Sequence, residues 1–358
     1  MSTLTEDLVR ATLSKVRYPG FSRDIVSFGL VKGITIQGGE VTVQMQLATN
    51  DPKVPQAIKT ESEAALQALE GVTGVQVRID IQAPPQAPAA GGPGSAATAL
   101  PGIKHVIAVA SGKGGVGKST VATNLAIALK QVGARVGLCD CDMYGPSVAL
   151  MFGSRERPMA TEDNRIIPIE AAGLKLMSMG FLLDDDAPAV LRGPMVTRYT
   201  QQFLRQVEWG ELDVLVLDLP PGTGDIQLTI VQTVALAGAV IVTTPQEVAL
   251  IDARKAVSMF AKVNVPIFGL VENMSYFISP ETGTRFDIFG TGGGEREAKR
   301  LGVPLLGTLP IDIATREGGD RGIPVTEADR ESPVSKAFVA IAGELWEILG
   351  GETKKASF

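Results

Sequence analysis

Apolar residues along most of this chain occur in short unbroken runs, and these runs alternate with longer stretches in which apolar positions recur at helical spacing. An unbroken apolar run bounded by turn residues is typical of a strand buried on both faces, as in a parallel sheet. The candidate strands of this kind are Val106–Ala110, Arg135–Asp140, Leu174–Met179, Val214–Asp218, Ala239–Thr243, Ile267–Glu272 and Leu305–Leu309. The pattern predicts an α/β fold with a doubly wound, mostly parallel sheet and helices on both faces.

The last helical stretch, Pro333–Leu349, carries its apolar side chains on one stripe. The positions of the stripe are Val334, Phe338, Ile341, Leu345 and Ile348. We expect a packing helix that closes the domain. A helix lying on a membrane surface is the alternative.

The first 82 residues have a mixed pattern that predicts a small α+β domain. The expected elements are helices over Glu6–Val16 and Val54–Leu69 and strands over Val31–Gln37, Glu40–Leu47 and Val75–Ile81. Residues 83–102 are rich in Pro, Ala and Gly and have no charged residue, so we expect a flexible linker there. The large α/β domain then spans residues 103–350, and residues 351–358 form a tail.

A phosphate-binding motif follows the first strand of the large domain. Gly112–Ser119 matches G-x-x-x-x-G-K-S/T, in which glycines let backbone N–H groups close around phosphate oxygens. The predicted nucleotide-binding residues here are Gly112, Lys113, Gly114, Gly115, Val116, Gly117, Lys118, Ser119 and Thr120. Lys118 would add a catalytic positive charge and Ser119 a hydroxyl for Mg²⁺. The alternative is a glycine-rich turn with an incidental lysine.

Three aspartates stand where two other strands end, which is the edge at which ligands bind in such sheets. Asp142 is expected to orient or activate the attacking water, and Asp140 to hold the hydration shell of Mg²⁺. Asp218 would bind Mg²⁺ through water, and the turn after it, PPGTG, would sense the γ-phosphate. A single aspartate after a strand is more often a helix cap or turn former.

Composition restricts the partners and the compartment. A net charge of −6 argues against nucleic-acid binding, and no apolar stretch is long enough to cross a membrane. The first residues are acidic where a signal peptide would be apolar, so we expect a cytoplasmic protein. The two cysteines, Cys139 and Cys141, are too close in sequence to staple distant segments. The single histidine, His105, has no partner motif and is expected to be structural.

Several long motifs together resemble those of the ApbC/Mrp family of P-loop ATPases, which carry iron–sulfur clusters and belong with the deviant-Walker ATPases of the MinD and ParA types. The motifs are GKGGVGKST, DCDMYGPS, LRGPM, WGELDVLVLDLPPGTGDIQLT and VENMSYF, and the amino-terminal YPGFSRDIVSFGLV resembles a small iron–sulfur-assembly domain. The resemblance implies ATP as the nucleotide and a homodimer that sandwiches it. Lys113 would then reach the partner's phosphates and act in catalysis, and Asn273 would contact adenine. Lys113 could instead be a solvated charge.

The sequence departs from this family where a cluster would bind. Members usually place C-x-x-C just beyond the N-M-S-Y-F stretch, so that two subunits supply four thiolates to a 4Fe–4S cluster. Ser279 and Thr282 stand there in this chain, and hydroxyls do not replace thiolates on iron. Cys139 and Cys141 could contribute sulfurs in a dimer, but they flank Asp140, and packing residues are the better interpretation. The cluster ligands therefore stay unknown.

Three functions follow from these patterns. The first is an ATPase that delivers iron–sulfur clusters to recipient proteins as a nucleotide-dependent homodimer. The second is an ATPase of the same family that acts as an assembly scaffold without binding a cluster itself. The third is a positioning ATPase of the MinD or ParA type, against which the acidic composition stands.

Overall fold

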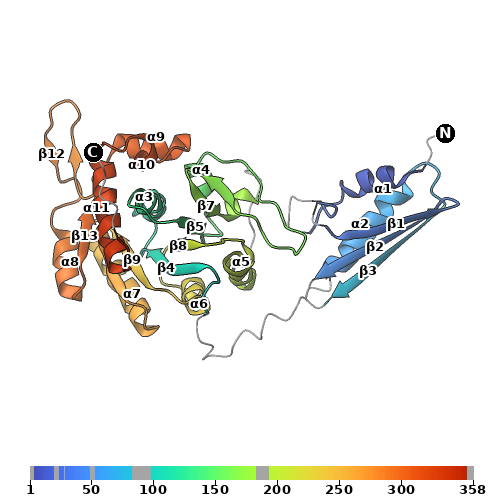
Figure 1. Cartoon of the computed structure of the whole chain (residues 1–358), viewed down its shortest axis with the longest axis horizontal. Helices are drawn as coiled ribbons and strands as arrows, with labels where there is room; N and C mark the ends of the chain where they lie inside the picture. The colour runs from blue at the N-terminus through green and yellow to red at the C-terminus, as the bar shows by residue number, and fades with distance from the viewer. Residues whose placement is uncertain are drawn as a thin grey trace. The chain divides into compact units, whose positions relative to one another are not determined.

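A computed structural model of the chain describes residues 4–19, 24–27, 29–48, 53–82, 98–182 and 193–352 (Figure 1). These residues form two compact units, one from residues 4–82 and the other from 98–182 and 193–352. Most of the predicted linker and tail lies outside the described residues, and their borders stay a prediction. Leu100, from the end of that linker, is buried, and the Gly102 carbonyl accepts a hydrogen bond from the Leu212 amide (2.9 Å). The larger unit therefore already includes these residues.

The first unit packs two helices on a three-stranded sheet. Its elements are α1 (Glu6–Leu13), β1 (Val31–Gln37), β2 (Glu40–Ala48), α2 (Lys53–Gln67) and β3 (Gly74–Gln82). β1 pairs antiparallel with β2, and β2 pairs parallel with β3 through the crossover helix α2. Alternate residues of β2, such as Val41 and Val43, are buried, which gives the sheet one apolar face. The α+β architecture agrees with the sequence pattern.

The second unit is built on an eight-stranded sheet in the order β13-β10-β9-β4-β8-β5-β7-β6. Its strands are β4 (Ile103–Ala110), β5 (Val136–Asp140), β6 (Ile169–Ala171), β7 (Leu174–Met177), β8 (Leu212–Asp218), β9 (Gly238–Thr243), β10 (Ile267–Glu272) and β13 (Leu305–Thr308). Every neighbouring pair is parallel except β6 with β7. The predicted mostly parallel α/β sheet is confirmed. Because β4 lies in the middle, the loop after it emerges between the ends of β8 and β9.

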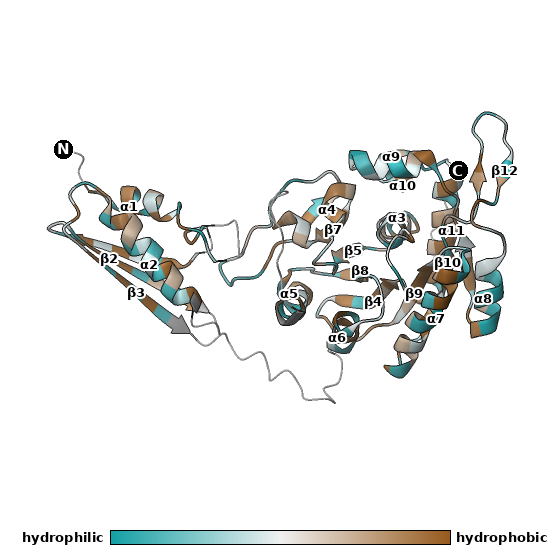
Figure 2. Cartoon of the chain, turned by 180° about the vertical axis from the view of Figure 1, so that it is seen from behind, coloured by the Kyte–Doolittle hydropathy of each residue, from teal (hydrophilic) through white to brown (hydrophobic). Residues whose placement is uncertain are grey.

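Helices cover the sheet and a short hairpin projects from it. The helical elements are α3 (Lys118–Gln131), α4 (Val148–Met151), η1 (Met179–Phe181), α5 (Gly193–Gln206), α6 (Asp225–Thr233), α7 (Glu247–Lys262), α8 (Gly293–Leu301), α9 (Ile313–Arg321), α10 (Val325–Ala328) and α11 (Pro333–Ile348). The hairpin pairs β11 (Phe277–Ile278) with β12 (Arg285–Phe286). Figure 2 shows apolar colour on the central strands and hydrophilic colour over much of α8 and α9. No described helix is long and apolar enough to cross a membrane.

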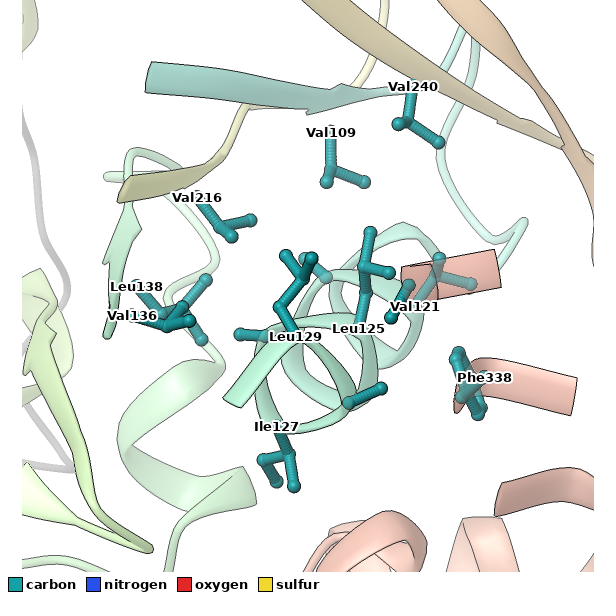
Figure 3. Packing of buried hydrophobic residues seen from close by; sticks show 14 of the residues in the cluster. Val109, Val121, Leu125, Ile127, Leu129, Val136, Leu138, Val216, Val240 and Phe338 are labelled. Atoms are coloured by element: carbon teal, nitrogen blue, oxygen red, sulfur yellow. The ribbon is translucent and has the colours of Figure 1, made fainter. Parts of the chain in front are cut away.

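The core of this unit lies between α3 and the sheet. In Figure 3, Leu125 and Leu129 of α3 face Val109 and Val216 of the strands, while Phe338 of α11 packs from the other side. Each of these side chains is at most 2% exposed, and burial of one large apolar side chain stabilises the fold by about 1.5–3 kcal/mol. The core therefore fixes the amino end of α3, which begins at Lys118.

The last helix α11 packs against α3 and β13, as predicted for a helix that closes the domain. Four of the predicted stripe positions are buried, namely Val334, Phe338, Ile341 and Leu345. Ile348 was expected on the same stripe but is 47% exposed, and it is the last residue of the helix.

Candidate functional site

The loop between β4 and α3 has a backbone that requires glycine at several positions. Gly115 and Gly117 have φ angles of 81° and 80°, in the left-handed region. A Cβ on Gly112 would overlap the carbonyl oxygen of Asp252 in α7, and a Cβ on Gly117 would overlap the side-chain amide of Asn273. The loop thus packs closely against α7 and against Asn273, the residue that follows β10.

A second loop, after β8, is tied to this first loop by its backbone. The Gly222 amide donates to the Ser111 carbonyl at 3.0 Å, and the Ser111 hydroxyl donates to the Lys113 carbonyl at 2.9 Å. The Leu219 amide also donates to the Val109 carbonyl at 3.0 Å. The predicted γ-phosphate sensor, PPGTG, therefore lies against the phosphate-binding motif.

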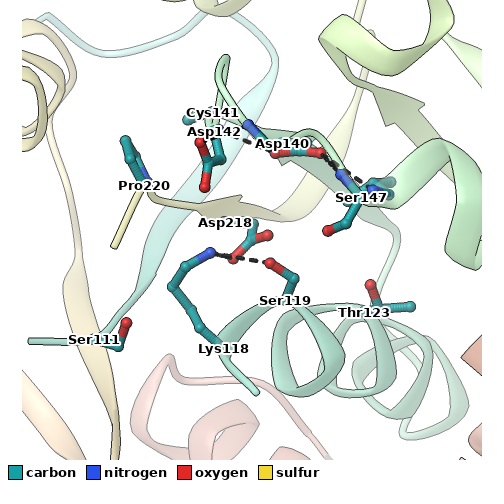
Figure 4. A network of polar contacts seen from close by, with 12 residues as sticks. Ser111, Lys118, Ser119, Thr123, Asp140, Cys141, Asp142, Ser147, Asp218 and Pro220 are labelled. Carbon is teal, nitrogen blue, oxygen red and sulfur yellow. Dashed lines mark hydrogen bonds and ion pairs between the residues drawn. The ribbon is translucent and has the colours of Figure 1, made fainter. Parts of the chain in front are cut away.

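Lys118 is the cation of the site and is only 6% exposed. Its ammonium forms an ion pair with Asp218 and donates to the Ser119 hydroxyl at 3.1 Å (Figure 4). The sequence placed these three residues in one site, and the structure brings them together.

Asp218 and Asp140 are paired on neighbouring strands and are both fully buried. Burial, together with repulsion by Asp218, raises the pKa of Asp140 to about 7, although hydrogen bonds from backbone N–H groups and the charge of Lys118 oppose the shift. Burial also raises the pKa of Asp218, although Lys118 opposes this shift. The Oδ2 atom of Asp218 is buried and has no hydrogen-bond partner among the residues that the structure describes. One ammonium is thus matched with two carboxylates, and one carboxylate oxygen is unpaired.

Asp140 acts as a structural anchor for the loop that follows β5. Its Oδ1 accepts from the Asp142 amide at 3.0 Å. Its Oδ2 accepts from the Ser147 amide at 2.9 Å, the Val148 amide at 3.2 Å and the Ser178 hydroxyl at 2.9 Å. Only Oδ1 keeps room for a further donor such as a metal-bound water. Sequence reasoning did not identify Ser178, which lies 38 positions away, and no local pattern marks it.

Asp142 stabilises a turn and faces a cavity. Its Oδ1 accepts from the amides of Tyr144 (3.3 Å) and Gly145 (3.2 Å). It lines a cavity of about 460 Å³ between the segment that follows β5 and the segment that follows β8. The other lining residues are Tyr144, Gly145, Pro220, Pro221, Gly224, Asp225, Ile226 and Gln227. Asp142 therefore lies in the wall of an open cavity, and its role toward water stays a prediction.

Buried polar atoms without a partner gather at this edge. Among the described residues they are Ser62, Ser147, Trp209, Asp218 and Gln227. Three of them follow or end β5 and β8: Ser147 lies in the loop after β5, Asp218 ends β8, and Gln227 lies in α6 just beyond it. Burying such an atom unpaired costs about 1–3 kcal/mol, so three in one place indicate a site built for a polar ligand. Sequence reasoning missed Gln227, and Ser147 appeared only as the last residue of DCDMYGPS.

Comparison with known proteins identifies the family. A family model described as "NUBPL iron-transfer P-loop NTPase" matches residues 102–346. The chain belongs to this family. A second model, "Iron-sulfur cluster assembly protein", matches residues 6–79. Both agree with the resemblance drawn from the motifs.

Relatives match over almost the whole chain. An iron–sulfur cluster carrier protein from Synechocystis sp. is 44% identical over 353 residues, which cover 96% of this chain and 97% of the relative. A protein of the same name from Deinococcus radiodurans is 47% identical over 345 residues, with 96% and 95% covered.

Solved structures show the same fold in the larger unit. A nucleotide-binding protein from Archaeoglobus fulgidus in complex with ADP is 36% identical, with a TM-score of 0.57, and covers 65% of this chain and 91% of its own. The cell division ATPase MinD of Pyrococcus furiosus has a TM-score of 0.54 at 24% identity, with 68% and 99% covered, and so shows the fold alone.

The two remaining predicted nucleotide contacts of this family member differ in their surroundings. Asn273 is 9% exposed and its Nδ2 donates to the Val116 carbonyl at 2.9 Å, which leaves its Oδ1 to accept from an adenine amino group. Lys113 is half-buried and forms no ion pair with any residue that the structure describes. Its contact with a partner's phosphates and the adenine contact of Asn273 both stay predictions.

The two cysteines are buried side by side at the end of β5. Cys139 and Cys141 are fully buried with their Sγ atoms 3.9 Å apart. The hydrogen bond to Cys139, together with burial, raises the pKa of the Cys141 thiol well above its usual range, so this thiol stays protonated. Ser279 and Thr282 lie in the turn of the β11–β12 hairpin, where the Thr282 amide donates to the Ser279 hydroxyl at 3.4 Å. In the part of the chain that the structure describes, no group of three or more His, Cys, Asp or Glu residues could hold a metal ion.

Proposed function

We propose that this chain binds and hydrolyses ATP with Mg²⁺, and that it works as a homodimer in the transfer of iron–sulfur clusters to recipient proteins. The observation that carries the nucleotide site is the unpaired, buried Oδ2 of Asp218 beside Lys118 and Ser119, at the start of α3. A helix start with exposed amides and a buried lysine suits phosphate, and an unpaired carboxylate suits a cation.

The charges and donors of the site fit Mg²⁺. Asp140 and Asp218 carry more negative charge than Lys118 neutralises, and Mg²⁺ prefers oxygen ligands with several retained waters. Ser119 would bind the ion directly and Asp218 through water, with Asp140 supporting that shell. The ion would supply charge neutralisation between the phosphates.

The chain's own residues would then divide the work of phosphoryl transfer. Lys118 holds positive charge against the phosphates, and Asp142 orients the attacking water from the wall of the cavity. Lys113, which has no ion pair among the described residues, would reach the nucleotide of the partner subunit. Asn273 would accept a hydrogen bond from adenine with its Oδ1.

The names of the relatives support iron–sulfur clusters as the cargo, since they are called carrier proteins. A second form of the proposal is that this chain drives transfer as a scaffold without ligating the cluster. The buried cysteines and the hydroxyls at Ser279 and Thr282 favour this second form.

Two measurements test these proposals. Calorimetry with ATP and Mg²⁺ on the folded full chain should show binding, and its absence would remove the nucleotide site. Anaerobic reconstitution with iron and sulfide, followed by metal counting and an absorption spectrum, separates the two forms. A colourless protein supports the scaffold. A coloured protein that loses its iron when Cys139 and Cys141 are replaced by serine supports direct carriage by those thiols.

A further inference from the structure

Ser147 has a hydroxyl that the fold does not use. It is the N-cap residue of α4, where a serine normally accepts a hydrogen bond from an amide of the first turn. Here its side chain makes no capping bond. The carboxylate of Asp140 accepts from the Ser147 and Val148 amides. The hydroxyl oxygen is nevertheless buried and has no partner among the described residues.

The backbone of Ser147 is held firmly, so the unused hydroxyl has a defined place. Its amide donates to Asp140 at 2.9 Å, and its carbonyl accepts from the Met151 amide at 3.0 Å. In Figure 4 the hydroxyl points from its loop toward the side where Ser119 and Asp218 lie. Asp218 has its own unpaired oxygen there.

Ser147 and Asp218 do not hydrogen-bond to each other, so both require a third group. A serine hydroxyl has one donor and two acceptor lone pairs, whereas an ionised carboxylate only accepts. One donor-rich group that satisfies both is the water shell of a divalent cation, whose waters donate to the oxygens around them.

We propose that Ser147 is a positioning residue that accepts a hydrogen bond from a water of the divalent cation entering with the nucleotide. This inference rests on the proposed nucleotide site. Because Ser147 and Asp142 lie on one loop anchored by Asp140, cation binding then fixes the loop that presents Asp142 to the cavity.

The test measures the affinity for Mn²⁺ as a probe, by electron paramagnetic resonance in the presence of saturating ADP. Removing a side chain that hydrogen-bonds to a metal ligand typically lowers metal affinity by about 10-fold or more. We expect a loss of Mn²⁺ affinity of this size for Ser147→Ala. ADP affinity in EDTA should stay within about twofold, because no phosphate contact is lost. Ser147→Thr, which keeps the hydroxyl, should restore Mn²⁺ affinity.

A second readout excludes a merely structural serine. Removal of an unpaired buried hydroxyl should leave the melting temperature of the apo protein unchanged or raise it. Tryptophan fluorescence measures this temperature, since both tryptophans lie in the larger unit. Thr123→Val is the matched control, because the Thr123 hydroxyl also appears in Figure 4 but bonds to Met151 Sδ at 3.5 Å. It should not change Mn²⁺ affinity.

Three results would overturn the inference: unchanged Mn²⁺ affinity of Ser147→Ala, an equal loss of ADP affinity in EDTA, or a lower apo melting temperature. If the wild-type chain binds no ADP at all, the proposed nucleotide site itself is wrong. If the wild-type chain binds ADP and Mn²⁺ normally and Ser147→Ala has no effect, only the role of Ser147 is wrong.

Discussion

Asp140 and Asp218 are register partners at the ends of β5 and β8, and both are completely buried. Lys118 is the cation that pairs with Asp218. Burial is the main cause of the raised pKa of Asp140, and repulsion by the neighbouring carboxylate of Asp218 adds to it. Below about pH 7 the metal-free protein therefore holds a proton on Asp140.

The first prediction concerns stability against pH. The pKa of Asp140 is about 7 in the fold and about 3.9 in an unfolded chain, so between these values the folded state binds the extra proton. Stability of the larger unit should therefore fall as pH rises from about 5 to about 8. Urea unfolding in EDTA, followed by tryptophan fluorescence at several pH values, measures it.

Asp213 provides the control for this pH dependence. Its bond to Arg135 lowers the pKa of Asp213, so the stability it contributes is lost only when pH falls below about 4. Asp213→Asn should keep the slope between pH 5 and 8, and Mg²⁺ with ADP should flatten it. Equal stability at pH 5 and pH 8 in the metal-free wild type would contradict the buried pair.

The second prediction removes the buried cation. Lys118→Ala should reduce ATP turnover by about 10²-fold or more, because charge on the transferred phosphate loses a preorganised partner. It should also lower the stability of the metal-free protein, since Asp218 loses its ion pair. Turnover is measured well below the melting temperature of the variant. Lys336→Ala, on an exposed pair with Glu331, is the control. Normal hydrolysis by Lys118→Ala would refute the assignment.

The third prediction concerns the close packing of the phosphate loop. Gly112→Ala places a methyl group against the Asp252 carbonyl, and such overpacking costs about 1–3 kcal/mol. The free energy of unfolding should fall by that amount, with weaker nucleotide binding as the loop shifts. Gly343→Ala is matched to it, because its added methyl in α11 meets nothing within 4 Å. That variant should be slightly stabilised by the higher helix propensity of alanine.

The fourth prediction separates binding from pairing. Lys113→Ala should keep ATP binding near the wild-type level, because amides and Lys118 hold the phosphates. The substitution should reduce hydrolysis by about 10²-fold or more if Lys113 contacts the nucleotide of the partner subunit, because such a cation stabilises the charge of the transition state. Sedimentation with ATP should then show less dimer than the wild type. Unchanged sedimentation and turnover would leave Lys113 as a solvated charge.

The large sheet could be predicted because its strands are unbroken apolar runs. The phosphate loop could be predicted because its backbone conformation requires glycine at fixed positions of the motif. The antiparallel strand β6 and the β11–β12 hairpin were not predicted, since strands of three and two residues carry no period. The donors gathered by Asp140 come from a turn and from Ser178 on another strand's end, so they depend on tertiary packing. For the same reason the sequence did not show that Ser147 has no structural use for its hydroxyl.

The last prediction tests the division of labour between the two aspartates after β5. Asp142→Asn keeps a side-chain oxygen for the Tyr144 and Gly145 amides, so the turn should persist and ATP should still bind. Loss of the carboxylate that orients or activates water should slow hydrolysis by about 10²–10⁴-fold. Single-turnover hydrolysis with bound ATP measures this step directly. Asp225→Asn, in the wall of the same cavity, should remain close to wild type. If Asp142→Asn instead loses ATP binding, Asp142 holds the loop or the metal, and the water must be oriented by another residue of the cavity wall.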